Sequence, residues 1–145
     1  MKKNTTIEKE FEKFAENIIF NGSEHKEFFF KQLLKCRNVD EYHVALVYCP
    51  GIARDTRGHV DQIYDFKSGC IKPECLYEGW QTSGSARIVR MAFNLYCNGT
   101  PSVYNHEDAE EQIQECGKYT VEDLFCCGYA KYLWEAVKLR YPEYM

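Results

Sequence analysis

Residues 79–85 read GWQTSGS and lead into an apolar segment that carries Arg87. The start of a helix presents free backbone N–H groups and the positive end of the helix dipole, and glycine lets the backbone approach an anion. Hydroxyl groups and a guanidinium would complete a phosphate pocket, and Trp80 would stack on a base. The same residues also fit a helix cap, a core tryptophan and a surface ion pair. The spacing matches neither a Walker loop nor a dinucleotide-binding fingerprint.

A second polar cluster, residues 55–59 (DTRGH), lies at an expected helix start. Arg57 can form charge-assisted hydrogen bonds to a phosphate or a carboxylate, and His59 can act as an acid or a base, for example with Asp55. A salt bridge that fixes the turn after Pro50 explains the cluster without a ligand. If the two segments meet, they form a site for a small anionic or nucleotide-like ligand. The predicted ligand-binding residues are Arg57, His59, Trp80, Gln81, Ser83, Ser85 and Arg87.

Eight cysteines and four histidines are candidate nucleophiles, bases and metal ligands. Zinc sites usually draw on closely spaced ligand pairs, but no Cys-x-x-Cys is present, and the partners of Cys70 and Cys75 would be distant. So many Cys–His pairs are possible on paper that none is singled out. We therefore predict no catalytic residue, no metal and no cofactor. His43 is expected to be a hydrogen-bonded core or boundary residue, and His25 to be solvated.

An acidic run lies near the C-terminal third of the chain, at Glu107, Asp108, Glu110 and Glu111, with no basic residue inside it. These carboxylates could meet the basic groove of a nucleic-acid enzyme and compete with the nucleic acid. A solvated loop would also explain them. We predict the four residues as a partner-binding surface.

Composition limits the possible classes of protein. A chain of 145 residues is one domain by length, and 45% hydrophobic and 15% aromatic residues exclude a disordered or low-complexity protein. The net charge of −4 argues against direct binding to nucleic acid. No apolar run is long enough for a membrane span or a leader, so a cytoplasmic protein with reduced thiols is expected.

The hydrophobic pattern is helical almost throughout and predicts an all-α, compact single-domain bundle of about five to six helices over residues 1–145. The first helix, residues 1–20, is a possible addition to the core. A second helix is capped by Ser23, and a third is capped by Asp40 and stopped by Pro50-Gly51.

A fourth helix is expected from residue 55 or 56 to about residue 68, followed by a short one that begins at Pro73. Residues 86–96 form a helix with a strong apolar face. Residues 98–119 are an exposed connection with one acidic helical turn, and Thr120 caps a last helix that reaches Arg140.

Several segments together resemble an uncharacterised family of small proteins encoded by phages and conjugative elements of Gram-positive bacteria. These segments are ALVY at 45–48, DTR at 55–57 with His59, GWQTSGS at 79–85, RMAFNLY at 90–96 and LRYPEY at 139–144. The resemblance covers roughly residues 24–145. It implies a genetic setting but no chemistry, and accessory genes of such elements often counter host defences.

Three functions follow as hypotheses. The first is a non-enzymatic accessory protein that binds and inhibits a bacterial defence protein such as a CRISPR effector. The second is a binder or sponge of a small anionic ligand, such as the nucleotide signal of a defence system. The third is a small hydrolase-like enzyme. A homodimer is possible, because the aromatic excess suits an interface as well as a core.

Overall fold

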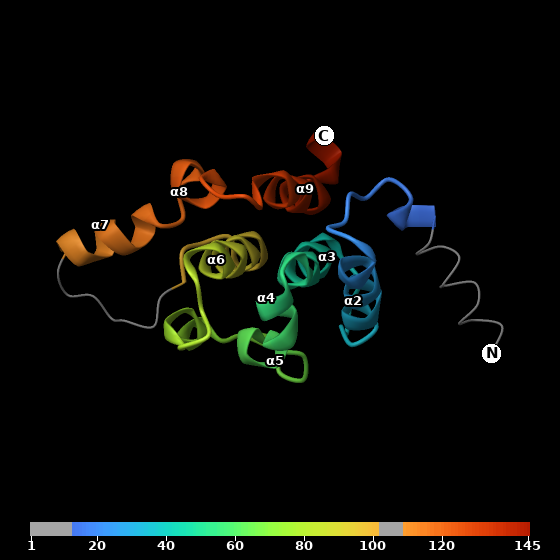
Figure 1. Ribbon diagram of the computed structural model, residues 1–145, viewed down its shortest axis with the longest axis horizontal. Coiled ribbons are helices and arrows are strands. Elements are labelled where there is room, and N and C mark those ends of the chain that lie inside the picture. Colours follow the sequence, from blue (N-terminus) through green and yellow to red (C-terminus); the bar gives the residue numbers. More distant parts are fainter. Residues whose placement is uncertain (1–12, 102–108) are drawn as a thin grey trace.

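The computed structural model describes residues 13–101 and 109–145, and this part of the chain is a helical bundle (Figure 1). Its helices are α2 (Ser23–Leu33), α3 (Glu41–Tyr48), α4 (Arg54–Gly58), α5 (Val60–Ile63), α6 (Ser83–Cys97), α7 (Ala109–Gly117), α8 (Val121–Phe125) and α9 (Ala130–Arg140). Short 3-10 helices are η1 (Cys49–Ile52), η2 (Pro73–Tyr77) and η3 (Pro142–Tyr144). The predicted all-α class is confirmed. Strands β1 (Tyr64–Asp65) and β2 (Cys70–Ile71) form one small antiparallel hairpin.

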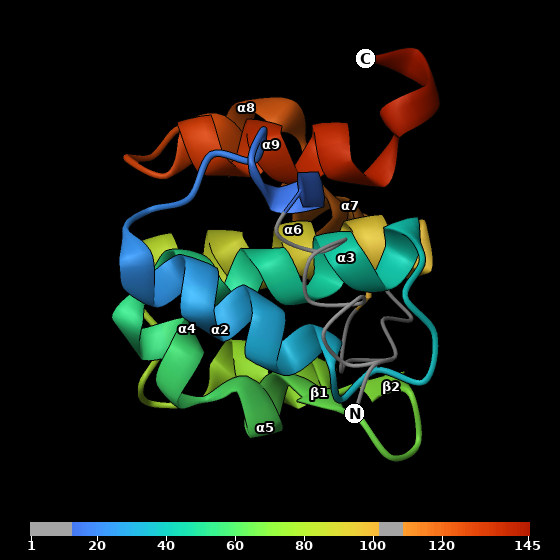
Figure 2. The same cartoon turned by 90° about the vertical axis from the view of Figure 1, so that its right-hand side faces the viewer.

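Helix α3 is the centre of the bundle. Its run from Val44 to Tyr48 is buried, as is the following Cys49. A helix that is apolar all round must be covered on every side, and α3 packs against α2, α6 and α9. Figure 2 shows α9 and α8 above α6 and α3, with α4, α5 and the hairpin below.

The start and end of α3 follow from local sequence. Asp40 is the N-cap, as predicted, and its Oδ1 accepts a hydrogen bond of 2.9 Å from the backbone N–H of His43. The chain then enters η1, where Pro50 lies in the first turn. A Cβ atom at Gly51 would overlap the His25 ring and lie 2.9 Å from Cδ1 of Phe28. This close approach explains why glycine follows the proline.

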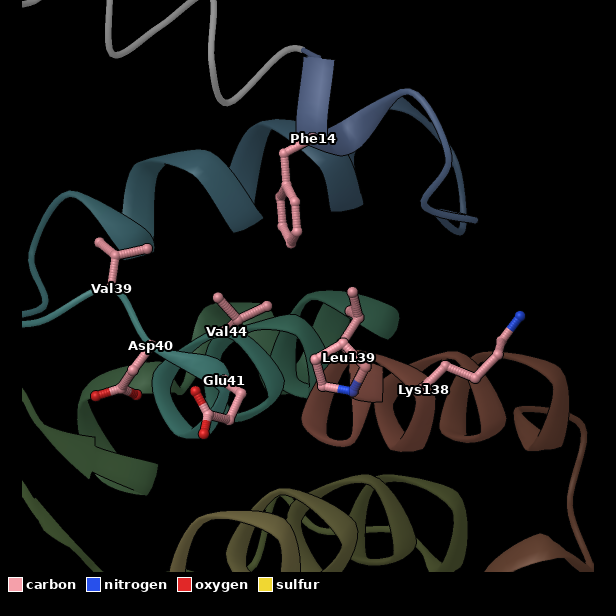
Figure 3. Close-up of a pocket in the computed structure, with 8 residues that line it drawn as sticks. Phe14, Val39, Asp40, Glu41, Val44, Lys138 and Leu139 are labelled. Carbon is pink, nitrogen blue, oxygen red and sulfur yellow. The ribbon is translucent and has the colours of Figure 1, made fainter. Parts of the chain in front are cut away.

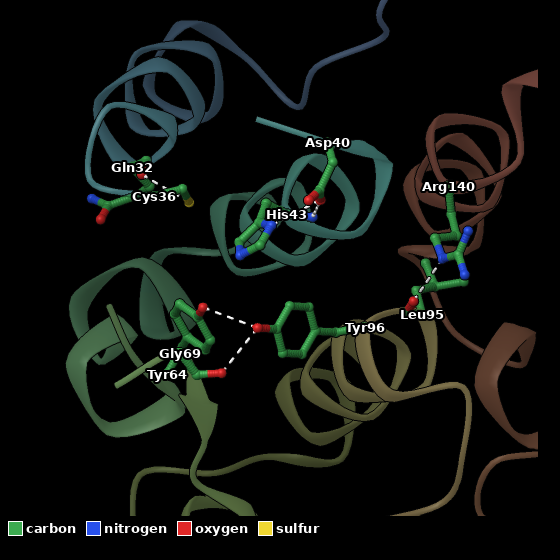
Figure 4. Close-up of polar contacts among 9 residues, drawn as sticks. All are labelled: Gln32, Cys36, Asp40, His43, Tyr64, Gly69, Leu95, Tyr96 and Arg140. Carbon is green, nitrogen blue, oxygen red and sulfur yellow. Dashed lines mark hydrogen bonds and ion pairs between the residues drawn. The ribbon is translucent and has the colours of Figure 1, made fainter. Parts of the chain in front are cut away.

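Helix α6 is capped at both ends. Thr82 is its N-cap and forms a capping box with Ser85, and Asn98 ends it in the left-handed conformation at φ 55°. The Arg140 side chain of α9 donates from Nε to the Leu95 carbonyl at 2.8 Å (Figure 4). A terminal nitrogen of Arg140 also donates to Asn98 Oδ1 at 3.0 Å. A positive group at the C-terminal end of α6 also suits the helix dipole.

The predicted fourth helix is wrong in its extent. The chain turns at His59 between α4 and α5, and from Tyr64 it forms the hairpin rather than continuing as a helix. The Asp65 side chain accepts hydrogen bonds from the N–H of Lys67 and from the Ser68 hydroxyl, and Gly69 has a φ of 75°. These turn contacts compete with the backbone hydrogen bonds that would continue the helix.

Three other predicted boundaries need correction. Ser23 is the first residue of α2 and not its N-cap, which is Gly22 at φ 88°. The expected connection 98–119 contains the nine-residue helix α7, not a single acidic turn. Thr120 does cap a helix, but that helix, α8, ends at Phe125, and α9 begins only at Ala130. Most of the predicted first helix lies outside the described residues. Among the described helices, none is long and apolar enough to span a membrane.

Candidate functional site

The structure brings His59 and Trp80 together. Their rings are stacked, with centroids 4.2 Å apart and planes inclined by 2°. The Trp80 indole N–H donates to Gln62 Oε1 at 2.8 Å. His59 Nδ1 lies 2.7 Å from the backbone carbonyl of Asp55, to which it donates, so its Nε2 is the remaining nitrogen. The Asp55 carboxylate is not the partner of His59, and the acid–base pair considered for a hydrolase is absent at this position.

Arg57 contacts neither His59 nor Trp80 through a hydrogen bond of its guanidinium. Its guanidinium donates to the Gly51 carbonyl at 2.8 Å and to Glu24 Oε2 at 2.9 Å. These contacts join α4 to η1 and α2, which is the role that the ligand-free interpretation gives to this cluster. The neighbouring Thr56 is fully buried and donates to the Pro50 carbonyl at 2.6 Å.

The polar side chains at the start of α6 form hydrogen bonds with one another and with the backbone. The Ser85 hydroxyl contacts Thr82 and donates to Gln81 Oε1 at 2.6 Å, and Ser85 is buried. Gln81 in turn donates to the Cys75 carbonyl at 3.0 Å. Gly84 allows close packing of Tyr129, because a Cβ there would lie 3.0 Å from Tyr129 Cε2. Here the glycine serves packing between helices.

Arg87 lies on the α8 side of α6. It donates to the Asp123 backbone carbonyl at 2.6 Å, is ion-paired with the Asp123 carboxylate at 3.3 Å, and donates to the carbonyl of the exposed Ser83 at 3.2 Å. Of the seven predicted ligand-binding residues, His59 and Trp80 stack on each other. Arg57 and Arg87 contact different elements. The binding role of the seven stays a prediction.

The prediction that His25 is solvated is wrong. Its side chain is fully buried between Phe20, Tyr48 and Tyr132, and it bonds Tyr48 O through Nε2 at 2.8 Å. Nδ1 accepts from the Asn21 N–H at 2.9 Å. Burial lowers the pKa of His25 to about 4, Arg57 acts in the same direction, and the Tyr48 bond opposes it. Both ring nitrogens therefore serve the fold.

A carboxylate–imidazole pair that the sequence analysis did not single out is formed by Asp40 and His43. His43 Nδ1 is 2.8 Å from Asp40 Oδ1, and the His43 ring packs edge-on against Tyr96. Burial opposes ionisation of Asp40, but the hydrogen bonds and charge of His43 and the backbone N–H of Tyr42 together outweigh it and lower the pKa of the carboxyl. The N-cap and N3 spacing of these residues is a signal that could have revealed the pair. His43 is the hydrogen-bonded boundary residue that was expected.

Burial makes several thiols poor nucleophiles. It raises the pKa of Cys36 to about 11, with a contribution from Asp40, and that of Cys75 to about 12. Cys36 Sγ donates to the Gln32 carbonyl at 3.5 Å (Figure 4). Among the described residues, the hydrogen bonds of the cysteines go to backbone carbonyls and a threonine hydroxyl, not to an imidazole.

The acidic run has its described part on α7. Glu110 and Glu111 are exposed in the first turn of this helix, whereas Glu107 and Asp108 lie outside the described residues. α7 is joined to the body by Glu115, which is buried, accepts a hydrogen bond from the Tyr77 hydroxyl and is 3.4 Å from Lys118 Nζ. Tyr119 adds a bond of 2.7 Å to the Pro101 carbonyl.

Helices α7 and α8 also carry exposed apolar side chains. Ile113 is 72% exposed and Val121 is 73% exposed. A shallow hollow of about 500 Å³ runs along α7, with Ile113 and Thr120 among its lining residues. We call α7 and α8 with these side chains the acidic arm. Figure 1 shows α7 and α2 at opposite ends of the described part of the molecule.

Comparison with known proteins identifies a family for nearly the whole chain. Residues 15–145 match DUF6075, a family of unknown function. The match begins inside the predicted first helix, earlier than the motifs that carry the resemblance. Neither a curated protein nor a solved structure matches the chain. The protein belongs to the DUF6075 family.

Proposed function

We propose that this protein acts without catalysis, by binding a partner protein through the acidic arm. The observation that carries the proposal is the pairing of exposed carboxylates with exposed apolar side chains on α7 and α8. Glu110 and Glu111 lie close in sequence to Ile113, and Glu122 follows Val121. Interfaces commonly have an apolar centre surrounded by charged residues. A large exposed apolar side chain at this place has no role in the core.

Charge indicates what kind of partner would fit. The net charge is −4, and the arm adds local carboxylates that would attract a basic surface and speed association. A protein groove that holds nucleic acid is basic, so occupation by the arm would exclude the nucleic acid. The motif resemblance to proteins of phages and conjugative elements supports a bacterial defence protein, such as a CRISPR effector, as the partner.

A plating assay tests this function. A phage is plated on bacteria that express this protein, in one host with a single defined defence system and in a matched host from which that system is deleted. We expect more plaques only where the defence system is present. An increase of equal size in a host that lacks every known defence system would contradict the proposal.

A charge-reversal pair tests the arm itself. Glu110→Lys with Glu111→Lys should abolish the protection, because the surface would then repel a basic partner. Glu74→Lys with Glu78→Lys makes the same change in net charge at exposed positions in and beside η2, and should protect normally. Circular dichroism shows whether both variants are folded. Equal protection by the two variants would exclude the arm as the binding surface.

A further inference from the structure

A groove of about 410 Å³ lies on a different part of the molecule from the acidic arm. It is bounded by the start of α3, the end of α9 and the helical turn at residues 13–15. Figure 3 shows the Phe14 ring pointing into it toward Val44 and Leu139. Val39 and Pro142 complete the apolar lining. This volume falls in the range of about 300–1,000 Å³ that is typical of small-molecule sites.

The charged groups of this groove are divided between its two ends. Asp40 and Glu41 lie at one end and Lys138 at the other (Figure 3). The Lys138 ammonium is 2.9 Å from Glu135 Oε2, so its charge is already balanced. Asp40 accepts two hydrogen bonds from His43 at Oδ1, and the backbone N–H of Tyr42 also interacts with this carboxylate. Glu41 is exposed and forms no ion pair with another described residue.

We propose that this groove binds a small organic cation, an amine or quaternary ammonium with an apolar aliphatic or aromatic body. The apolar body would displace water from Val44, Leu139 and Pro142, which favours binding. The positive nitrogen would lie at the carboxylates of Asp40 and Glu41. The ring of Phe14, which points toward Val44 and Leu139, would contact the apolar body. An anion would meet repulsion at the same end, and a neutral molecule would gain nothing from the two carboxylates.

Three probes with one apolar body test the proposal: 4-phenylbutylamine, 4-phenylbutanol and 4-phenylbutyrate. Methyl NMR spectra of the full-length protein report the site, because Val39, Val44 and Leu139 carry methyl groups in the groove. We expect the amine to shift these methyl signals and to bind at least about tenfold more tightly than the alcohol. The carboxylate should bind more weakly than both.

A variant pair tests the carboxylates. Asp40→Asn with Glu41→Gln removes two negative charges, and asparagine still caps α3. We expect this variant to bind the amine and the alcohol equally. Glu74→Gln with Glu78→Gln changes the net charge by the same amount away from the groove and should keep the preference for the amine. If the double variant unfolds, Glu41→Gln alone should still reduce the preference.

Three results would overturn the proposal. They are the absence of methyl shifts with every probe, equal affinity for the amine and the carboxylate, or an unchanged preference for the amine after the charges are removed. None of these measurements involves α7 or α8. The groove and the proposed function of the acidic arm can therefore fail independently.

Discussion

His25 shows how one buried side chain can couple stability to pH. The folded pKa of about 4 is below the value of 6.5 for a solvated histidine, so the unfolded chain binds more protons between these pH values. The contribution of neutral His25 to the free energy of unfolding is complete above pH 6.5 and decreases as the pH falls toward 4. Through this one group, the free energy of unfolding changes by at most about 1.4 kcal/mol per pH unit.

Urea unfolding at several pH values between 7 and 4 checks this. We expect the free energy of unfolding of the wild-type protein to fall over this interval. His25→Gln, which cannot titrate, should have a lower stability at pH 7 but a flatter dependence on pH. The lowered pKa values of Asp40, Asp65 and Glu115 also remove stability at the acid end of this interval. They do so equally in both proteins, so the difference between the two curves reports His25. Parallel pH curves for the two proteins would refute the role of His25.

Gly51 is constrained by the same histidine. Gly51→Ala would place a methyl group against the His25 ring, which is held by hydrogen bonds at both nitrogens. We expect a loss of about 1–3 kcal/mol in the free energy of unfolding, as for other overpacked sites. Gly58→Ala is the matched control, because nothing lies within 4 Å of its Cβ position. It should be neutral or slightly stabilising. A Gly51→Ala protein as stable as the control would show that the ring can move.

At the scale of elements, Arg140 holds α9 to the end of α6. Its guanidinium lies 3.6 Å from the centre of the Tyr42 ring and donates to the Leu95 carbonyl and the Asn98 side chain. Lysine keeps the charge but cannot form both bonds in one plane. Arg140→Lys should therefore lower the free energy of unfolding by about 2 kcal/mol. Arg54→Lys, at an exposed position, should change it little. Chemical denaturation distinguishes the two, and equal stabilities would contradict this bridging role.

At the scale of the whole molecule, stability should be unevenly distributed. Every residue of α3 from Val44 onward is buried, whereas in α7 Glu115 is the buried residue. Amide protons in an exposed, weakly packed helix exchange through local opening. We expect the amides of α7 to exchange much faster than those of α3 in native-state hydrogen exchange. Equal protection of the two helices would mean that α7 is part of the cooperative core.

Caps and apolar spacing allowed α3, η2 and the start of α8 to be predicted from the sequence. Asp40 and Thr120 each bond to a backbone N–H three residues away, so their effect is local. Apolar spacing gave the wrong prediction between residues 64 and 71. The apolar residues there fit a helical period, but the hydrogen bonds of the Asp65 side chain stabilise the turn of a hairpin instead.

The sequence alone determined the helical class and the caps at Asp40 and Thr120, because these depend on contacts between near neighbours. The tertiary structure decided which polar residues are available for function. His25 bonds to a carbonyl 23 residues away, and Arg87 to one 36 residues away. Burial and the positions of such partners arise only when the helices pack together. For this reason the sequence could not indicate the partners of Arg57 and Arg87, nor that Asp40 lies beside the groove that Phe14 and Leu139 line.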